Sequence, residues 1–472
     1  MSMKKFYFFL LFLSVVVNMP AQKKYAVLIT GEDKNPYWTE IVRERPDGYI
    51  EDENGNVEIS SAEGLAWLIS VVNGLNGCQA DDFEGRKVEI KCDIDLSQGE
   101  WVPIGDCRTL PDNAFKGAFY GGGHSIDNLY LRDIASDFLG LFGSLSNAEV
   151  RGVSLNGGKV SGKMYCGGIA GLCTDDSEID NCVVNLYVIG ESCTGGIVGC
   201  NRNSVIRNCC YVFSKFEPVD VLSGGVVGVN ESDGQDAVIE NCYFDSRMIG
   251  SLNTCYLGGI AGLNKVGGEG ATALIRNCYT VLHGHTWCGE GGIVGRNTGG
   301  DVLNCYYNYD YDGYDINAIG DGDMGDLNCS VFSCPEGQIS ILSETVSVGG
   351  IETDDLLEAL NYWIARQENP SQYRRWKYGV NGLPEYDDPD YDIPETDGSS
   401  SASILYPNPT IGIVHIEGEA IAEIKVYNTL GQLVKTVKNT NEVDLKGLPK
   451  GIYTLRIACE NGPDLSKKVV LE

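Results

Sequence analysis

Residues 224–242 have the sequence GGVVGVNESDGQDAVIENC, and this stretch contains the two short motifs that decide the fold. The first motif is Gly-Gly-(Ile/Val)-x-Gly, with Asn230 two residues after its last glycine. The second is Asn241-Cys242, which follows Ile239 by two positions. Both motifs recur. The first begins at Gly167, Gly195, Gly224, Gly258 and Gly291, and the second at Asn181, Asn208, Asn241, Asn277 and Asn304.

The copies of the first motif are 28, 29, 34 and 33 residues apart, which is the period of a repeat protein. Between them lie short β-rich runs such as residues 237–244, and no amphipathic helical pattern. Each repeat is therefore predicted to form one coil of a β-solenoid, with equivalent residues stacked about 4.8 Å apart. We expect the glycines at corners that need positive φ or close backbone approach, and the asparagine amides bonded to those of neighbouring coils.

The repeated cysteines and tyrosines each allow more than one interpretation. The cysteines would stack coil on coil, chiefly as small buried hydrophobic residues, with disulfides between coils and metal ligation as the alternatives. Tyrosines follow the Asn-Cys motif at Tyr211, Tyr243, Tyr279 and Tyr306. An outward stripe of these rings would suit a sugar or a peptide, whereas an inward stripe would belong to the core.

Composition limits the partners. The 472 residues include 60 Gly and 18 Cys, the hydrophobic content is 43%, and the formal net charge is −31. This is a glycine-rich chain that still has enough apolar residues for a packed core. Its negative charge repels DNA phosphates and anionic lipid surfaces, which excludes nucleic acid as a partner.

Residues 1–22 have the pattern of an export signal. Lys4 and Lys5 precede an apolar run over residues 6–17, and small residues near Ala21 indicate cleavage. Residues 23–56 would then form the N-terminal segment of the exported chain. The apolar run is short for a bilayer span, and no later stretch reaches about 18 apolar residues, so no membrane-spanning helix is expected.

Two amphipathic helices are predicted at the two ends of the solenoid. Ser60 and Glu63 have the spacing of a capping box before the first helix, and Thr353 is the expected cap of the second. Their apolar faces would be Leu65, Leu68, Ile69 and Val72, and Leu356, Leu357, Leu360, Trp363 and Ile364. Such helices would cover the open strand edges of the terminal coils, which otherwise invite aggregation.

The repeats over roughly residues 160–310 resemble the GLUG motif, a short glycine-rich repeat of large bacterial surface proteins. The Gly-Gly-Ile-x-Gly-x-Asn core carries the resemblance, and the Asn-Cys-Tyr element fits it. The runs that start at Ser61, Asp93, Trp101 and Phe115 look like the segment that commonly precedes these repeats. The resemblance implies a surface-exposed β-solenoid over residues 57–383.

The composition changes after residue 383. Residues 384–400 contain seven acidic residues and no basic one, which predicts a solvated, self-repelling linker. Residues 401–472 contain eight basic and eight acidic residues. Alternating runs such as 422–427 and 451–457 predict the antiparallel strands of a small immunoglobulin-like β-sandwich. The fold class is thus all-β, with a solenoid passenger and a separate sandwich.

Residues 401–472 also resemble the type A C-terminal sorting domain of the type IX secretion system. The residues that carry the resemblance include Tyr406, Pro407, Asn408, Pro409, Gly431, Gly451, Lys467 and Lys468. The resemblance implies that the type IX machinery moves the protein from the periplasm across the outer membrane, and that a sortase-like peptidase removes the domain. A secreted or cell-surface location follows from it.

Candidate chemical sites are few. The sequence lacks His-Glu-x-x-His, Gly-x-Ser-x-Gly and the P-loop motif. Closely spaced carboxylates between residues 310 and 326 offer the oxygen ligands that calcium prefers, although not at EF-hand spacing: Asp310, Asp312, Asp315, Asp321, Asp323 and Asp326. A solvated acidic loop is the alternative, and no other cofactor is expected.

The sequence therefore predicts an exported, non-catalytic surface protein, either an adhesin or another ligand-binding module, with a host glycan or matrix protein as partner. The alternative is a carbohydrate-active enzyme, a polysaccharide lyase or glycoside hydrolase, on the same β-helix. A groove with paired carboxylates would favour the enzyme. A smooth face with an aromatic stripe would favour the adhesin.

Overall fold

The structure is a computed structural model that divides into two compact units, residues 1–391 and 392–472. The residues that it describes are 35–107, 113–213, 216, 222–246, 256–282, 290–308, 316–323, 327–334, 339–379, 381–387, 404–406, 412–417, 421–427, 433–438, 440–459 and 465–471. The predicted export signal at residues 1–22 lies outside them.

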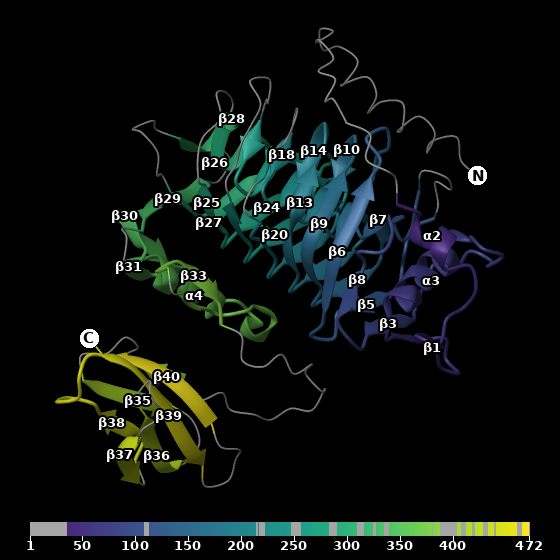
Figure 1. Cartoon of the computed structure of the whole chain (residues 1–472). Coiled ribbons are helices and arrows are strands. Elements are labelled where there is room, and N and C mark those ends of the chain that lie inside the picture. Colours follow the sequence, from purple (N-terminus) through teal and green to yellow (C-terminus); the bar gives the residue numbers. More distant parts are fainter. Residues whose placement is uncertain are drawn as a thin grey trace. The chain divides into compact units, whose positions relative to one another are not determined.

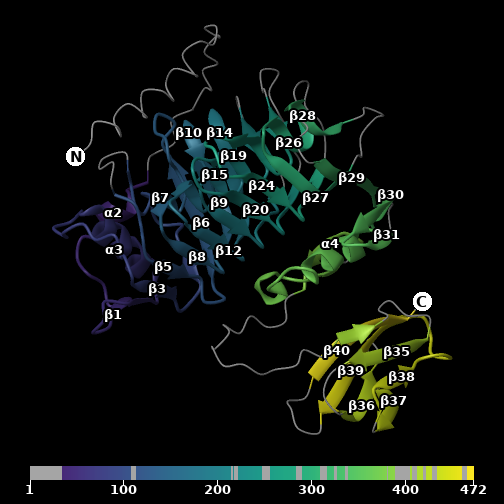
Figure 2. The same cartoon turned by 180° about the vertical axis from the view of Figure 1, so that it is seen from behind.

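The first unit is a β-solenoid of about eight turns in a chain that is 53% strand and 8% helix (Figure 1). Parallel strands of successive coils lie side by side, and Figure 2 shows the same stack from behind. Within the described residues these strands make up two long sheets, one of 20 strands and one of 11. The predicted β-solenoid is therefore confirmed.

The larger sheet contains β1 (Tyr49–Glu51), β2 (Val57–Ile59), β3 (Lys87–Ile90), β4 (Ile94–Asp95), β5 (Ala118–Tyr120), β6 (Ser125–Arg132), β8 (Glu149–Arg151), β9 (Ser154–Ser161), β12 (Glu178–Asp180), β13 (Val183–Ile189), β16 (Val205–Arg207), β17 (Cys210–Tyr211), β20 (Ala237–Glu240), β21 (Tyr243–Ser246), β24 (Ala273–Arg276), β25 (Tyr279–Leu282), β27 (Asp301–Asn308), β29 (Leu327–Ser333), β30 (Ile341–Val348) and β31 (Ile351–Asp355). The smaller sheet contains β7 (Phe142–Ser146), β10 (Met164–Cys166), β11 (Ala170–Thr174), β14 (Ser192–Gly195), β15 (Val198–Arg202), β18 (Ser223–Gly224), β19 (Val227–Ser232), β22 (Leu257–Gly258), β23 (Ala261–Val266), β26 (Glu290–Thr298) and β28 (Asn317–Gly322).

One inward column of apolar side chains runs the length of the solenoid. The apolar residue two positions before each Asn-Cys motif pairs in register with its counterpart one coil away, as Ile206 does with Ile239. The column continues into coils that lack the glycine motif, and its members are at most 1% exposed: Val57, Val88, Phe119, Val150, Ile179, Ile206, Ile239, Ile275 and Val302. Burial of these side chains removes apolar surface from water at every coil.

Two ladders of buried asparagine amides follow the corners of the coils. In the first, the Nδ2 atom of Asn201 donates to Oδ1 of Asn230 at 2.8 Å, and the pattern continues through Asn264 to Asn297. In the second, Nδ2 of Asn241 donates to Oδ1 of Asn208 at 2.7 Å, and Nδ2 of Asn277 donates to Asn241 at 2.8 Å. The predicted amide ladder is therefore present twice. Each amide satisfies its neighbour where water cannot reach.

The sequence predicted glycines both at corners with positive φ and at points of close approach. In the structure, asparagines take the first role and the motif glycines take the second. The corner residues with positive φ are the asparagines of the Asn-Cys motif, with Asn241 at 54°. The motif glycines serve close approach instead. A Cβ atom on Gly225 would lie 2.2 Å from the Phe244 ring, and one on Gly292 would lie 2.3 Å from the Tyr307 ring. The second glycine of the motif thus makes room for an aromatic residue inside three of the coils, and Gly168 and Gly259 make room for Val184 and Thr280 in the other two.

The cysteines of the Asn-Cys motif are buried as free thiols. Their stack runs through Cys182, Cys209, Cys242, Cys278 and Cys305. Burial raises the pKa of these thiols far above its usual range, so they remain protonated and unreactive. The interpretation as small buried hydrophobic residues is correct for this stack, and disulfides between its coils are absent.

Three α-helices and one 3₁₀ helix accompany the described coils: α2 (Trp38–Ile41), α3 (Ala62–Asn73), α4 (Leu356–Ile364) and η1 (Pro370–Gln372). The expected caps are wrong by one and two residues. Ser61, rather than Ser60, caps α3, because its Oγ accepts from the Gly64 amide at 3.1 Å. Asp355, rather than Thr353, caps α4 through the Glu358 amide at 2.9 Å. Thr353 still contributes, because its hydroxyl accepts from the Asp355 amide.

The second unit contains two antiparallel sheets around a core of its own. One sheet has β34 (Ile404–Tyr406), β35 (Ile413–Glu417) and β38 (Glu442–Asp444), and the other has β36 (Ile421–Tyr427), β37 (Leu433–Lys438), β39 (Gly451–Cys459) and β40 (Leu465–Leu471). Val414 and Val443 from the first sheet pack in one cluster with Ile424 and Leu455 from the second. Both sheets thus share one buried interior.

Replacing Asn241 by Leu should lower the free energy of unfolding of the first unit by at least about 3 kcal/mol. The change removes the acceptor of two hydrogen bonds of 2.8 Å, from Asn277 Nδ2 and from the indole N–H of Trp376, which both donate to Asn241 Oδ1. It also places a bulky side chain at positive φ. Urea unfolding followed by far-UV circular dichroism measures the loss.

The matched control is Asn147→Leu, since Asn147 is exposed and has a φ of 51°. This variant places leucine at a similar positive φ but removes no residue of the amide ladders. Equal losses in the two variants would contradict a stabilising role for the amide ladder.

Candidate functional site

The segment after α4 folds back across the outer surface of the solenoid (Figures 1 and 2). We call residues 370–387 the strap; within it η1 is followed by β32 (Trp376–Tyr378), which pairs with β33 (Pro384–Tyr386). The strap is bound through the second amide ladder. The Arg374 amide donates to Asn208 Oδ1 at 3.0 Å, and the Tyr386 hydroxyl donates to the Asn241 carbonyl at 2.6 Å. Strands β32 and β33 of the strap therefore belong to the same compact unit as the coils.

The strap covers an aromatic column on the outer face of the coils. Cys210, Tyr243, Tyr279 and Tyr306 occupy equivalent positions in successive coils. The rings of Tyr243 and Tyr279 stack with centroids 5.2 Å apart, and Trp376 packs edge-on against both. Tyr279 and Tyr306 are each 1% exposed. This part of the predicted tyrosine stripe points outward, yet the protein itself occupies it.

Tyr211 does not belong to that column. It pairs in register with Phe244, one position further along the strand than Tyr243, and is fully buried inside the coil. The cause is the second cysteine of its repeat, Cys210, which shifts the tyrosine by one residue. Neighbouring residues of a strand point to opposite faces, so a shift by one moves the ring from outside to inside.

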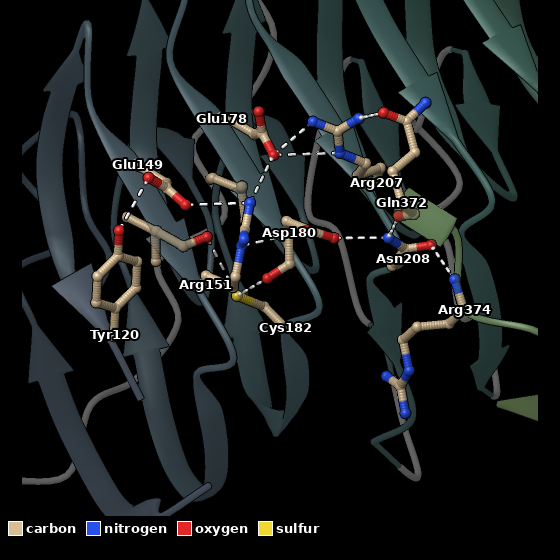
Figure 3. A network of polar contacts seen from close by, with 12 residues as sticks. Tyr120, Glu149, Arg151, Glu178, Asp180, Cys182, Arg207, Asn208, Gln372 and Arg374 are labelled. Carbon is tan, nitrogen blue, oxygen red and sulfur yellow. Dashed lines mark hydrogen bonds and ion pairs between the residues drawn. The ribbon is translucent and has the colours of Figure 1, made fainter. Parts of the chain in front are cut away.

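A row of charged side chains runs beside the strap on the outer face of β8, β12, β16, β20 and β24 (Figure 3). Signs alternate along one column of this row: Arg151, Asp180, Arg207, Glu240 and Arg276. Arg276 Nη2 lies 2.6 Å from Glu240 Oε2, and Arg207 Nη2 lies 2.5 Å from Glu178 Oε1. Alternating charge places an attractive pair at each step of the stack, where equal charges would repel.

The two ends of this row differ. Toward the strap, Arg207 Nη1 donates to Gln372 Oε1 at 3.0 Å, and the Glu240 side chain is only 3% exposed. Away from the strap, Arg151 Nη2 lies 3.1 Å from Glu149 Oε1, and the Tyr120 hydroxyl donates to Glu149 Oε2 at 3.1 Å (Figure 3). Since Glu149, Glu178, Asp180 and Glu240 each lie within ion-pair distance of an arginine, we call this row the ion-pair ladder.

Asp180 is the most perturbed carboxyl of this ladder. Burial raises its pKa above the usual range, against the opposing hydrogen bond from Asn208 Nδ2 at 2.6 Å and the charges of Arg151 and Arg207. It ends the second amide ladder, because its Oδ1 accepts from Asn208 in the place of another asparagine. Asp180 therefore joins the two networks.

A second row of side chains lies further along the same face. We call Tyr130, Lys159, Tyr187 and Phe213 the outer row. The first three occupy equivalent positions on β6, β9 and β13, and all four side chains are half-exposed. Lys159 Nζ lies 5.5 Å from the centre of the Tyr187 ring, and the rings of Tyr187 and Phe213 are 6.0 Å apart. This row presents aromatic surface to solvent on a rigid sheet.

The predicted calcium loop is described only in part. Asp321 and Asp323 lie at the end of β28 and directly after it, whereas Asp310, Asp312, Asp315 and Asp326 lie outside the described residues. Asp321 Oδ2 is 3.6 Å from Arg296 Nε, and the Asp323 backbone bonds to Asn297. No three His, Cys, Asp or Glu side chains converge on a metal position in the described part of the chain. Calcium binding by this loop remains a prediction.

The predicted sorting residues fall on strands of the second unit where they are described. Tyr406 ends β34, Gly451 begins β39, and Lys467 and Lys468 in β40 pair with Leu455 and Thr454. Pro407, Asn408, Pro409 and Gly431 lie outside the described residues.

Sequence reasoning missed the ion-pair ladder, the outer row and the strap. The ladder did leave a signal, since a charged residue directly follows the apolar column residue in five successive coils, from Arg151 to Arg276. The strap left none, because Trp376 and Tyr386 have no fixed spacing from the repeats that they cover.

Comparison with known proteins assigns the C-terminal unit. Residues 404–472 match the family described as secretion system C-terminal sorting domain. The chain carries a type IX sorting domain. The protein is accordingly exported by type IX secretion to the cell surface or released.

Similarity elsewhere in the chain is more distant. A stretch of 128 residues is 34% identical to Halomucin of Haloquadratum walsbyi, which covers 25% of this chain and 1% of that protein. A solved structure from Bacteroides ovatus, provisionally described as an immunoglobulin A1 protease, aligns with a TM-score of 0.43 and 20% identity. That alignment covers 71% of this chain and 93% of the other. Among the described helices, none has the length and apolar character of a membrane span.

Replacing Asp180 by Asn should make the free energy of unfolding of the first unit vary less with pH in the acid range. The raised pKa of Asp180 means that the folded state holds a proton that the unfolded state releases near pH 4, so wild-type stability falls relative to the variant as pH rises through that range. Urea unfolding of both proteins at several pH values between about 3 and 7 measures the difference.

Asp47→Asn is the control for the loss of one carboxylate, because Asp47 is exposed. A wild-type advantage over Asp180→Asn that grows with rising pH would contradict the burial of Asp180.

Proposed function

We propose that the protein is an exported, non-catalytic binding module that presents the outer row to a ligand at the cell surface. The observation that carries this proposal is the contrast between two aromatic rows on one solenoid face. Trp376 of the strap packs against Tyr243 and Tyr279, and Tyr279 and Tyr306 are buried, whereas the four residues of the outer row remain partly exposed. Aromatic side chains held on a rigid sheet lose little entropy when a ligand packs on them.

The contacts of the strap support the distinction between the tyrosine column and the outer row. Trp376 and Tyr386 pack against the covered rings and both donate hydrogen bonds to Asn241, so that row is part of the stability of the fold. The outer row makes no such contribution through its exposed ring faces. Exposed aromatic surface that is not needed for folding is a feature of binding sites.

The partner that we propose is a host glycan or a matrix protein, and a neutral glycan suits the surface better than an acidic one. The net charge of −31 repels polyanions over the range of the Debye length. Lys159 alone contributes a positive charge to the row. Its ammonium group lies over the Tyr187 ring, and the Phe213 ring lies 6.0 Å from that ring, so the three side chains form one continuous surface.

The remaining parts of the chain fit the same proposal. Residues 1–22 would act as the export leader, the repeats would be of the GLUG type, and the second unit would be an immunoglobulin-like sandwich. We interpret α3 as a cover for the first coil, because its apolar side chains belong to the solenoid core cluster. After export, a sortase-like peptidase would remove the second unit.

A glycan and matrix-protein array first identifies the ligands that the wild type binds. Replacing Tyr187 by Ala should weaken binding to these ligands about tenfold, which corresponds to a loss of roughly 1.4 kcal/mol of binding free energy from the ring contact. Surface plasmon resonance on the array hits measures the loss. Tyr362→Ala is the control, because Tyr362 is a half-exposed aromatic residue on α4, outside the outer row.

Failure of the wild type to bind any member of the array, or equal losses in the two variants, would contradict a binding role for the outer row. Each glycan hit is also incubated with the protein and assayed for new reducing ends and unsaturated products. Turnover of a hit would favour the alternative, a polysaccharide lyase or glycoside hydrolase.

Deleting residues 401–472 should abolish surface delivery and leave the truncated protein in the periplasm. The solenoid should still fold there, because the second unit has a separate core and few contacts are expected across an acidic linker. Cell fractionation with immunoblotting measures the location, and protease resistance of the periplasmic form measures folding.

In the intact protein, the surface form should begin near residue 23 and end near residue 400, as measured by intact-mass spectrometry. Surface delivery of the truncated chain, or a mature form that retains Glu472, would overturn the proposed processing.

A further inference from the structure

A cavity of about 280 Å³ opens beside the outer row at its N-terminal end. Its walls come from β6, from the segment that follows β4, from β9 and from the start of the described chain. The lining residues are Asn35, Ser97, Glu100, Asn128, Tyr130, Arg132 and Gly158. Tyr130 belongs both to the cavity and to the outer row, so the two surfaces are continuous.

The backbone around Glu100 is held on both sides. The Leu96 amide donates to the Asp127 carbonyl at 2.8 Å, and the Trp101 amide donates to the Tyr130 carbonyl at 2.6 Å. Between these points, Glu100 exchanges backbone hydrogen bonds with Pro36 and Trp38, both at 2.9 Å. A loop that is fixed at this many points places its side chain in the cavity wall without the entropy cost of a mobile loop.

Glu100 is buried in a way that its surroundings do not explain. The residue is 2% exposed, and among the described residues no group donates a hydrogen bond to its Oε2 atom. A buried carboxylate oxygen without a donor costs free energy, because it has lost water and gained nothing in exchange. A fold retains such a cost where the group has a role other than stability.

The other polar groups of the cavity are already positioned by Asp95. Its carboxylate accepts from Asn128 Nδ2 at 2.9 Å, from the Ser97 amide at 3.0 Å and from the Ser97 hydroxyl at 2.9 Å. The hydrogen bond from Asn128, followed by those from Ser97, holds the pKa of Asp95 below its usual range. Asp95 therefore stays ionised and fixes the directions of Asn128 and Ser97.

We propose that this cavity binds one sugar ring of a neutral glycan, with the Glu100 carboxyl group accepting a hydrogen bond from a ring hydroxyl. Hydroxyl groups both donate and accept, which matches a wall of amides, hydroxyls, one carboxylate and one guanidinium. The Arg132 guanidinium in the wall disfavours a metal cation, and Glu100 disfavours an anion.

The rest of the glycan would continue over Tyr130 toward Tyr187. The volume is at the small end of the range for ligand cavities, which suits a single ring rather than an oligosaccharide. This inference rests on the proposed function, because it names the ligand class and the anchoring residue of the surface that the outer row belongs to.

The test uses the purified protein and a panel of methyl glycosides of glucose, galactose, mannose and N-acetylglucosamine, with saturation-transfer NMR to find a binder and calorimetry to measure its affinity. Glu100→Gln should reduce the affinity for the bound glycoside at least about tenfold, because a charged acceptor is replaced by a weaker neutral one. The variant should melt at the same temperature as the wild type or higher, since the Oε2 atom has no hydrogen bond in the protein to lose.

Glu44→Gln is the matched control, because Glu44 is exposed and makes the same change of charge. Tyr130→Phe is the second variant, which removes one cavity hydroxyl and keeps the ring, and it should also weaken binding. A lower melting temperature with unchanged affinity in Glu100→Gln would show a purely structural role and overturn the inference.

The two proposals fail differently. Binding of a glycan that depends on Tyr187 but is unaffected by Glu100→Gln and Tyr130→Phe would overturn the cavity site and leave the outer row intact. Binding of a single glycoside that depends on Glu100 but not on Tyr187 would support the cavity and overturn the outer row. Absence of binding by every glycoside would overturn the cavity site.

Discussion

In-register stacking of parallel strands is the constraint on which the first unit depends. Because each coil pairs residue by residue with the next, one position in the repeat becomes a continuous column along the solenoid. Each residue then has to pack against a similar residue of the next coil at the distance between neighbouring strands. Apolar residues, amides and thiols meet this condition directly, and they fill the inward columns and the corners.

Charged residues of one sign cannot stack on one another at this spacing, because they repel. The outer face of the solenoid avoids this repulsion by alternating the signs. A column of equal charges at that spacing would repel, so arginine alternates with aspartate and glutamate from Arg151 to Arg276. A cluster of several carboxylates on a β-helix resembles a catalytic set at first sight. Here the ion pairs of Asp180 and Glu240 explain the cluster without catalysis.

The strap decides which parts of the solenoid face are available to a partner. Trp376 packs against Tyr243 of β21 and Tyr279 of β25, Tyr386 packs against Tyr243, and the backbone of the strap is hydrogen-bonded to Asn208 and Asn241. The ring faces further along β6, β9 and β13 remain half-exposed. Export to the cell surface then places those faces, and the cavity beside them, where an external ligand can reach them.

The sequence by itself determined the solenoid, its buried apolar column, its amide ladders and its buried thiols, because each of these is a property of one repeat position multiplied along the chain. It also identified the sorting domain, since the motif around Gly451 and Lys467 is local. It left the face of the tyrosines open and wrongly grouped Tyr211 with the other three, because one extra cysteine shifts that tyrosine by one residue and places its side chain on the other face. Only the tertiary structure decided that the strap covers the tyrosine column, and that Glu100 meets Tyr130 in one cavity. Those contacts join segments with no shared period, so no pattern in the sequence records them.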